Sequence, residues 1–230
     1  MTDPYTLLGG QTVNDSIAIG AVSSNVVWHQ HKITRERREA LNGHRGSVIW
    51  LTGLPGSGKS TVASALEQYL HRSGCRSYVL DGDNVRHGLC GDLGFSEKDR
   101  EENIRRVAEV SRLFLDAGVI VICAFVSSYR KDRERARALF REGDFIEVYC
   151  NCPVEVCERR DPKGHYRLAR RGDIKEFTGI SSPYEEPDKA DLILDTATRS
   201  IDDCVDLASV VLRERGILPA LEDRLQRSVA

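Results

Sequence analysis

A glycine-rich segment that ends in a lysine and a serine occupies residues 53–60. It reads Gly53, Leu54, Pro55, Gly56, Ser57, Gly58, Lys59 and Ser60, which fits the pattern G-x-x-x-x-G-K-[ST]. Glycines let backbone N–H groups surround phosphate oxygens, while the ammonium of Lys59 reaches the outer phosphates and the hydroxyl of Ser60 can bind Mg²⁺. With Thr61, the segment predicts a site for ATP or GTP. The alternative is an ordinary glycine-rich turn, which the strand and helix expected on either side disfavour.

Two carboxylates and an arginine follow the next expected strand. The order is Asp81, Gly82, Asp83, Asn84, Val85 and Arg86, at the strand end where parallel sheets place their ligands. A kinase that acts on a hydroxyl group needs one carboxylate to accept the proton, and its metal ion needs an acidic partner. We expect Asp83 to be the base and Asp81 to join Ser60 at the metal ion. The alternative is a solvated Asp-Gly turn.

The elements that must hold these residues alternate between short apolar runs and helix-favouring stretches. We expect strands at 47–52, 77–81, 119–126, 145–150 and 191–195, and helices from the glycine-rich loop to about 72 and at 97–117, 130–141 and 201–215. Repeated strand–helix units imply a parallel sheet covered by helices. The fold class is therefore α/β, a three-layer α/β/α sandwich of the P-loop NTPase type with a central parallel sheet.

Local signals refine this outline. Thr34 can cap a charged helix over about 33–41 that should face water, and Ser96 with Asp99 forms a capping pair for the helix at 97–117. That helix should bury a stripe made of Ile104, Val107, Val110 and Phe114.

Residues 1–24 lack periodicity and are expected to form a flexible arm ahead of one domain over 25–230. Residues 159–187 form a long irregular stretch, which favours a functional role.

The composition sets limits on partners and location. A net charge of −2 gives no general attraction to nucleic acid or to an anionic membrane. The most apolar run, 117–126, is too short to span a bilayer, and no export signal precedes it. Seven cysteines without a CxxC pair favour reduced thiols in the cytoplasm. Cys150, Cys152 and Cys157 leave a metal site as the alternative to buried thiols.

Four ordered motifs resemble those of adenylyl-sulfate kinases. They are DGDNVRHGL, LGFSEKDREENIRR, AFVSSYRKDR and DPKGHYRLARRGDIKEFTGISSPYE, preceded by NVVWH, and the likeness runs from about residue 25 to 217. The resemblance implies transfer of the γ-phosphoryl group of ATP to the 3′-hydroxyl of adenylyl sulfate, with 3′-phosphoadenylyl sulfate and ADP as products. It also implies Mg²⁺ as cofactor, a homodimer, and functional coupling to ATP sulfurylase in sulfate assimilation.

The same resemblance carries substrate-binding roles to particular positions. Residues that match those holding the adenine and phosphosulfate are Asp83, Arg86, Phe95, Arg100, Asn103, Lys163 and Phe177. We expect Asn84, Val85, Val126, Ser127 and Lys175 to bind the substrate as well. Arginine forks suit the two anionic groups, and two phenylalanines could enclose a purine ring. Arg100, Asn103 and Arg106 recur every three residues, so the alternative for them is a solvated helical stripe.

Residues 159–175 resemble the lid of these kinases. They contain seven lysines and arginines against two aspartates, and such cations could offset charge on the transferred phosphoryl group and exclude water. An exposed basic loop is the alternative. Ser127 matches a serine that bacterial members phosphorylate, so it joins Asp83 and Lys59 as a candidate catalytic residue. Direct transfer needs no covalent step, and we therefore rank a role in lining the substrate site above a role as nucleophile. Ser128 and His165 stand where the family often has proline and leucine.

Two other functions remain open at this point. A kinase for another small hydroxyl compound would share the glycine-rich loop and the Asp81–Asp83 pair, because neither specifies the acceptor. A catalytically silent nucleotide-binding module that regulates a partner such as a sulfurylase would keep the fold. The presence of Lys59, Ser60 and Asp83 argues against the silent module.

Overall fold

A computed structural model of the chain describes residues 25, 27, 29 and 31–218. The chain divides into two units, 1–32 and 33–230, and the helices and strands below all lie in the second. The arm expected over residues 1–24 lies outside the described residues. Its flexibility and the domain expected over 25–230 therefore stay predictions.

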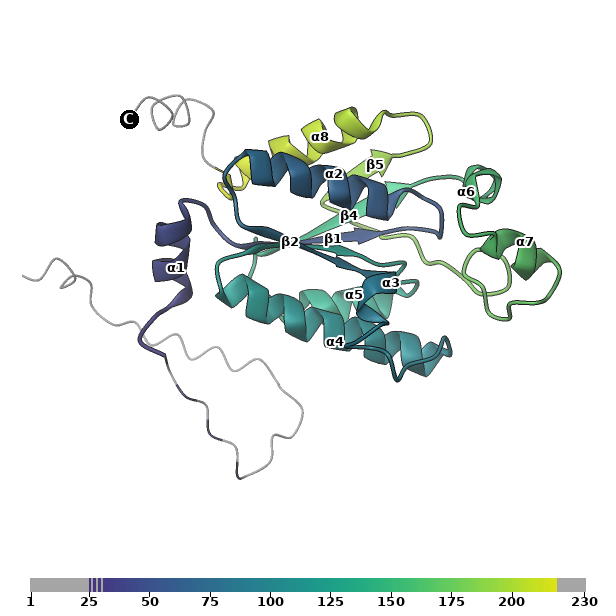
Figure 1. Cartoon of the computed structure of the whole chain (residues 1–230), viewed down its shortest axis with the longest axis horizontal. Helices are drawn as coiled ribbons and strands as arrows, with labels where there is room; N and C mark the ends of the chain where they lie inside the picture. Colours follow the sequence, from purple (N-terminus) through teal and green to yellow (C-terminus); the bar gives the residue numbers. More distant parts are fainter. Residues whose placement is uncertain (1–24, 26, 28, 30, 219–230) are drawn as a thin grey trace, which may run out of the picture. The chain divides into compact units, whose positions relative to one another are not determined.

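Five parallel strands form the central sheet, in the order β2-β3-β1-β4-β5 (Figure 1). Their bounds are β1 Ser47–Thr52, β2 Ser77–Asp81, β3 Ile120–Ala124, β4 Phe145–Asn151 and β5 Leu192–Asp195. In the central strand, Trp50 is in register with Cys123 of β3 on one side and Glu147 of β4 on the other. Because all strands run the same way, their carboxyl ends meet at one edge of the sheet, as the sequence predicted.

Helices cover both faces of this sheet. Their bounds are α1 Arg35–Asn42, α2 Lys59–Arg72, α3 Gly82–Val85, α4 Glu97–Asp116, α5 Arg130–Arg137, α6 Val154–Arg160, α7 His165–Arg170 and α8 Ile201–Glu214. In Figure 1, α2 and α8 lie on one face, and α4 and α5 lie on the other. The expected three-layer α/β/α sandwich is confirmed.

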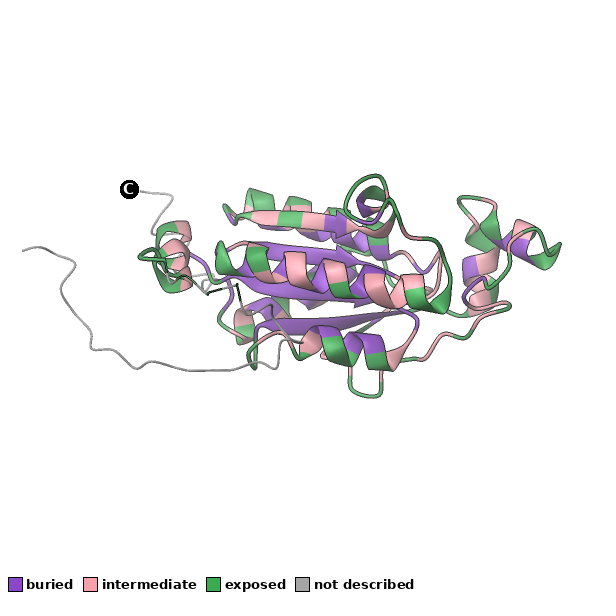
Figure 2. Ribbon diagram, turned by 90° about the horizontal axis from the view of Figure 1, so that it is seen from below, coloured by how far each residue is buried: buried purple, intermediate pink, exposed green. Residues whose placement is uncertain are grey.

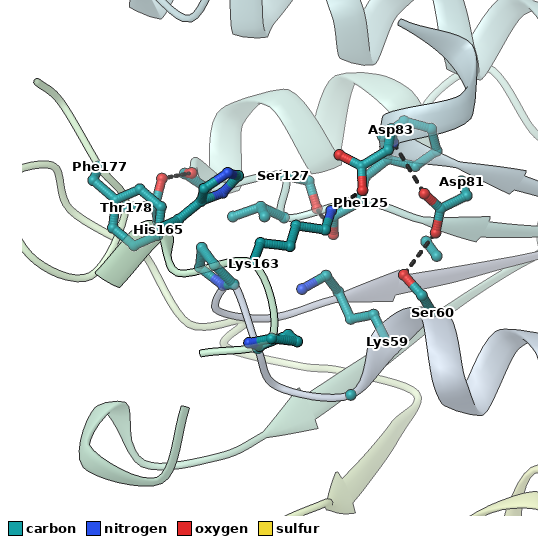
Figure 3. Close-up of a pocket in the computed structure, with 18 of the residues that line it drawn as sticks. Lys59, Ser60, Asp81, Asp83, Phe125, Ser127, Lys163, His165, Phe177 and Thr178 are labelled. Atoms are coloured by element: carbon teal, nitrogen blue, oxygen red, sulfur yellow. Dashed lines mark hydrogen bonds and ion pairs between the residues drawn. The ribbon is translucent and has the colours of Figure 1, made fainter. Parts of the chain in front are cut away.

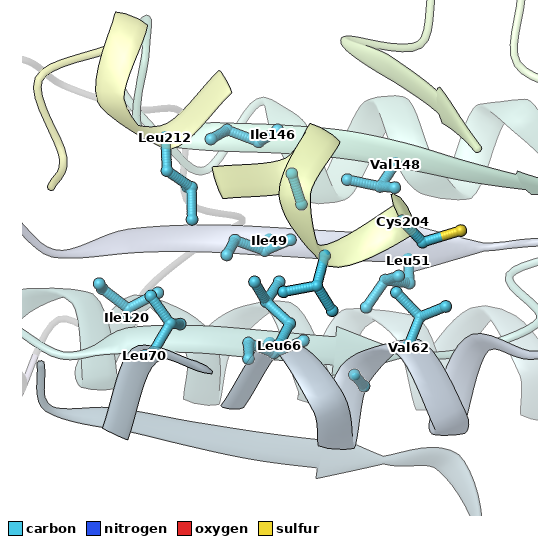
Figure 4. Close-up of a cluster of buried hydrophobic side chains, with 14 of the residues drawn as sticks. Ile49, Leu51, Val62, Leu66, Leu70, Ile120, Ile146, Val148, Cys204 and Leu212 are labelled. Carbon is cyan, nitrogen blue, oxygen red and sulfur yellow. The ribbon is translucent and has the colours of Figure 1, made fainter. Parts of the chain in front are cut away.

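The side chains of β1 alternate between the two faces. Ile49 and Leu51 join the core beneath α2 and α8 (Figure 4), whereas Val48 and Trp50 join the core beneath α4 and α5. Figure 2 shows the central strands of the sheet as a buried layer between helices that are partly exposed. Burying one large aliphatic side chain such as Leu66 of α2 stabilises the fold by about 1.5–3 kcal/mol.

Two predicted helix starts are confirmed. The Ser96 hydroxyl accepts a hydrogen bond from the backbone N–H of Asp99 at the start of α4, and the Thr34 hydroxyl accepts one from Arg37 at the start of α1. The expected stripe of α4 packs into the core, where Ile104 and Val107 are buried and Val110 and Phe114 are partly buried.

The expectation that the first helix would face water is wrong in part. Arg35 of α1 donates two hydrogen bonds to Asp144, at 2.6 and 2.8 Å, and Glu39 accepts one from the backbone N–H of Gly46. The Asp144 carboxylate is only 4% exposed. A charged sequence can therefore dock on the domain through buried ion pairs, which hydrophobic periodicity does not reveal.

Several element bounds differ from expectation, most of them by one or two residues. Helix α5 ends at Arg137 rather than at 141, because the chain then forms tighter turns in which Leu139 and Phe140 bond three residues back. Strand β3 spans Ile120–Ala124 rather than 119–126, since the chain turns away into a loop where Ser127 has a φ of 42°. The stretch expected to be irregular contains α7 and the end of α6.

All seven cysteines are buried free thiols. Burial raises the pKa of Cys150 and of Cys157 to about 12, so both thiols stay protonated at neutral pH. Among the described residues, no cluster of three or more Cys, His, Asp or Glu side chains could hold a metal ion. Within the same residues, no helix is long and apolar enough to cross a bilayer.

Candidate active site

The glycine-rich loop connects β1 to α2, at the carboxyl edge of the sheet. Gly53 has a φ of 149°, and a Cβ atom there would lie 2.7 Å from both the carbonyl oxygen of Cys150 and the hydroxyl of Ser57. Gly56 has a φ of 75°, and a Cβ atom there would lie 3.0 Å from the carbonyl oxygen of Cys157. Larger residues would therefore push the loop away from β4 and α6. The loop ends at the N-terminus of α2, which favours bound anions.

Lys59 lies under this loop with its ammonium turned inward. Its Nζ donates hydrogen bonds to the carbonyl oxygens of Gly53 at 2.9 Å and Leu54 at 2.7 Å, and the residue is only 7% exposed. Burial lowers the pKa of Lys59 to about 8. Phosphate oxygens next to this ammonium would favour its charged form, since an anion compensates for the lost hydration.

Ser60 and Asp81 meet at the mouth of the loop (Figure 3). The Ser60 hydroxyl donates a hydrogen bond of 2.6 Å to one Asp81 oxygen, and the other accepts one of 3.0 Å from the backbone N–H of Asp83. Asp81 thereby caps α3, the short helix that carries Asp83. A hydroxyl and a carboxylate side by side supply the oxygen ligands that Mg²⁺ prefers, so the residues fit the expected metal ion.

Asp83 faces the cavity from α3, and a cation from the lid reaches it. Lys163, in the turn before α7, donates a hydrogen bond to the Asp83 carboxylate in an ion pair. Figure 3 shows the Lys163 side chain extended across the pocket toward Asp83. The structure thus brings together two predicted residues from distant motifs, one on the sheet edge and one on the lid.

Arg86 and Phe95 form one stacked unit. The guanidinium carbon of Arg86 lies 4.2 Å from the centre of the Phe95 ring, and Arg86 Nη1 donates hydrogen bonds to the carbonyl oxygens of Leu93 at 3.0 Å and Gly94 at 2.9 Å. Burial lowers the pKa of Arg86 from its ordinary value. Phe95 is 65% exposed, so one face of its ring remains open to a ligand.

The α4 residues with the three-residue spacing divide into two groups. Arg100 and Asn103 line the cavity, whereas Arg106 pairs with Asp92 and Glu102. Asn103 is 5% exposed, and its Nδ2 atom is one of two buried side-chain polar atoms without a partner in the described part of the chain. A buried amide without a partner is unfavourable unless a ligand satisfies it. The solvated-stripe alternative thus does not apply to Asn103.

Ser127 follows β3 and is 6% exposed. Its hydroxyl donates a hydrogen bond of 2.9 Å to the Thr52 hydroxyl and accepts one of 3.2 Å from the Trp50 indole N–H. No histidine or carboxylate is hydrogen-bonded to this hydroxyl in the described structure. A nucleophilic serine needs such a base, and the arrangement instead supports the interpretation that Ser127 lines the site.

The lid packs directly on the glycine-rich loop. The Tyr166 hydroxyl donates to the carbonyl oxygen of Pro55 at 2.8 Å, and Arg160 donates to the carbonyl oxygen of Gly56 at 3.4 Å. Phe177 lies edge-on to Tyr166, with ring centres 4.9 Å apart, and forms part of the wall of the cavity. Residues 159–175 are therefore not a detached basic loop.

These parts surround one cavity of about 1110 Å³. Its wall includes the predicted residues Pro55, Gly56, Gly58, Lys59, Ser60, Thr61, Asp81, Asp83, Arg86, Phe95, Arg100, Asn103, Val126, Ser127, Lys163, Lys175 and Phe177. Five predicted residues lie outside the wall: Gly53, Leu54, Ser57, Asn84 and Val85. Leu54 packs against the lid and Val85 joins the core, while Asn84 is exposed.

Several wall residues were not predicted from the sequence. They include Ser128, Asp132, Tyr166, Thr178 and Thr196, whereas Arg160 is one of the expected lid cations. Asp132 is 3% exposed, has one carboxylate oxygen without a partner, and has its pKa raised by burial. One of these residues follows an acidic residue that the sequence shows. The Asp161 carboxylate accepts hydrogen bonds from the backbone N–H groups of Tyr166 and Arg167, and it thereby stabilises the first turn of α7.

Comparisons with known proteins agree with this geometry. The adenylylsulphate kinase family model matches residues 45–195. The adenylyl-sulfate kinase of Prochlorococcus marinus is 60% identical over 81% of this chain and 92% of its own length, and that of Erwinia tasmaniensis is 61% identical over 74% and 85%. The structure of the APS kinase CysC of Mycobacterium tuberculosis, in complex with AMPPNP and APS, is 47% identical, with a TM-score of 0.70 over 74% of this chain and 99% of that one. This chain belongs to the adenylyl-sulfate kinase family.

Proposed function

We propose that the chain is an ATP-dependent kinase that transfers the γ-phosphoryl group of ATP to the 3′-hydroxyl of adenylyl sulfate. The observation that carries this proposal is the continuity of one cavity between the glycine-rich loop and an anion-binding wall. Lys59, Ser60, Asp83, Arg86 and Arg100 all line this cavity, and Asp81 links the Ser60 hydroxyl to the backbone of Asp83. A donor and an anionic acceptor would therefore meet at Asp83.

On the donor side, residues 53–61 hold the phosphates of ATP. Backbone N–H groups of the loop and the N-terminus of α2 face the phosphates, and Lys59 exchanges its carbonyl partners for phosphate oxygens. Ser60 and Asp81 would hold Mg²⁺, which neutralises charge on the β- and γ-phosphates when bound. The Lys59 ammonium for the phosphates and the Ser60 and Asp81 oxygens for the metal ion are already in place at the loop.

On the acceptor side, Asp83 orients the 3′-hydroxyl and accepts its proton during transfer. Arg86, Arg100 and Lys175 supply cations for the phosphosulfate, while Phe95 and Phe177 contact the purine ring. Asn103 donates to the same ligand through the amide that has no partner in the described structure. Lys163 leaves Asp83 and contacts the transferred phosphoryl group, because that group carries more negative charge than a single carboxylate.

A coupled assay of ADP formation tests the proposal. ADP production should require both Mg²⁺ and adenylyl sulfate, and Lys59→Met should abolish it. Other nucleotides and sugars as acceptors separate this function from a kinase for another hydroxyl compound. ATP binding without turnover on any acceptor would instead support a silent nucleotide-binding module and end the proposal.

The oligomeric state and the cellular location are inferred from the family rather than from the geometry of the site. We infer a homodimer in the cytoplasm that acts on the product of an ATP sulfurylase. A structural relative from Thiobacillus denitrificans, 30% identical, is a hexameric APS kinase. Light scattering after size-exclusion chromatography would test the dimer, and a mass of one subunit would contradict it.

A further inference from the structure

Two strained residues stand in the wall of the cavity. Ser127 has a φ of 42° and Glu176 a φ of 54°, and they are the non-glycine residues with positive φ in the described part of the chain. Each carbonyl oxygen accepts a hydrogen bond from an arginine: Arg133 bonds Ser127, and Arg100 bonds Glu176. Such backbone conformations persist only where surrounding contacts hold them, and they concentrate at functional sites.

Arg133 of α5 is 2% exposed, and each of its nitrogens has a partner. Nε donates to Glu147 at 2.7 Å, Nη1 donates to the carbonyl oxygen of Ser127 at 2.6 Å, and Nη2 donates to the carbonyl oxygen of Glu185 at 2.7 Å. The planar fork thus joins two chain segments that are far apart in sequence. Arg133 is not in the cavity wall and cannot touch a ligand there.

The same two segments are joined at further points beside Arg133. The backbone N–H of Glu185 donates to the carbonyl oxygen of Ser128 at 2.8 Å, and the hydroxyls of Ser128 and Thr178 are 3.0 Å apart. Ser128 and Thr178 both belong to the cavity wall. The loop after β3 and the chain that returns from the lid therefore form one continuous wall, with Arg133 behind it.

Pairing with Glu147 alone does not explain why the charge is buried. Arg137, one turn further along α5, also reaches Glu147, at 3.5 Å, from a position that is 40% exposed. A buried ion pair contributes little to stability, because desolvation offsets the attraction. What Arg133 adds is the pair of carbonyl contacts, which only a buried fork at this point can make.

We propose that Arg133 is a positioning residue for the acceptor. It fixes the strained Ser127 peptide and ties it to Glu185, so that the wall facing adenylyl sulfate is set before the substrate binds. This inference depends on the proposed function for the identity of the acceptor. It predicts a selective effect on that ligand, because the ATP loop makes none of the Arg133 contacts.

The test compares the binding constants of adenylyl sulfate and of a non-hydrolysable ATP analogue, measured by calorimetry. Arg133→Lys keeps the charge beside Glu147, but one ammonium cannot hold both carbonyls in the same plane. A second variant, Arg133→Met with Glu147→Leu, replaces the whole pair by apolar side chains of similar size, which often preserves stability. Arg137→Met is the matched control, since it removes a Glu147 partner without touching the Ser127 loop.

Both Arg133 variants should weaken adenylyl sulfate binding by about tenfold or more, as for the loss of a charged hydrogen bond. ATP-analogue binding and the control should stay within about twofold of the wild type. Unchanged adenylyl sulfate binding in a folded Arg133 variant overturns the proposal. So does equal weakening of both ligands, or loss of folding in both variants, because Arg133 would then act through stability. Failure of the wild type to bind adenylyl sulfate would overturn the proposed function instead.

Discussion

Lys163 and Asp83, 80 positions apart in the sequence, form an ion pair across the cavity. Their side chains are 53% and 62% exposed, and an exposed pair contributes only about 0–1 kcal/mol to stability. The lid cation can therefore leave Asp83 at little cost when a phosphate enters. The pair places the cation that would meet the transferred group beside the base that would meet the hydroxyl.

The Asp83→Asn variant should keep ATP binding and lose most turnover. The amide keeps the size of the side chain but cannot accept the hydroxyl proton, so kcat should fall by about a hundredfold or more. Steady-state kinetics with adenylyl sulfate give kcat, and titration with an ATP analogue checks the donor site. Turnover near that of the wild type would remove Asp83 from the catalytic role.

Arg86→Ala should mainly weaken adenylyl sulfate binding. The change removes a cation from the acceptor wall and the stacking partner of Phe95, so the dissociation constant should rise by about tenfold or more. Arg106→Ala is a suitable control, because Arg106 bonds Asp92 and Glu102 outside the cavity wall. An equal loss in both variants would mean that general charge, rather than the Arg86 contact, governs binding.

The sequence predicted the sheet and the donor site well, because both depend on local rules. Alternating apolar strands and the glycine-rich pattern of residues 53–60 are short-range signals, and the structure places Lys59, Ser60 and Asp81 together as expected. The acceptor residues were located only through resemblance to a family. Neither Phe95 nor Phe177 carries a local signal that separates a ligand contact from ordinary packing.

The long-range contacts could not be predicted in this way. Arg133 belongs to a charged stretch, and its burial depends on Glu147 and two carbonyl oxygens from separate segments. The docking of α1 likewise depends on a contact between residues far apart in the sequence, Arg35 and Asp144. In both cases the segment is mostly charged, and the partner that buries the charge becomes visible only in three dimensions.

Replacing Ser127 by alanine should reduce kcat by less than about tenfold. Its hydroxyl bonds Thr52 and Trp50 and has no base as partner, so the loss should appear as lower stability, about 1–3 kcal/mol for an unpaired buried indole N–H. Kinetics and thermal melting separate the two effects. If transfer proceeded through phosphorylated Ser127, the variant would be inactive, and the wild type would retain labelled phosphate from ATP.

Lys59→Met should raise stability at neutral pH while it abolishes activity. Burial lowers the pKa of Lys59 from 10.5 to about 8, so between these values the unfolded chain holds a proton that the folded chain does not. The wild type therefore gains stability as the pH rises through this window, and below it the buried charge is unfavourable.

The variant lacks this charge, so its Tm should exceed that of the wild type at neutral pH by about 2–4 °C for each kcal/mol relieved. The difference should shrink as the pH approaches 10.5. Thermal melting across this range measures it, with Lys98→Met as the control because Lys98 is exposed on α4. A variant that melts below the wild type by the same amount at every pH would show that the hydrogen bonds of Lys59 to Gly53 and Leu54 outweigh the desolvation of its charge.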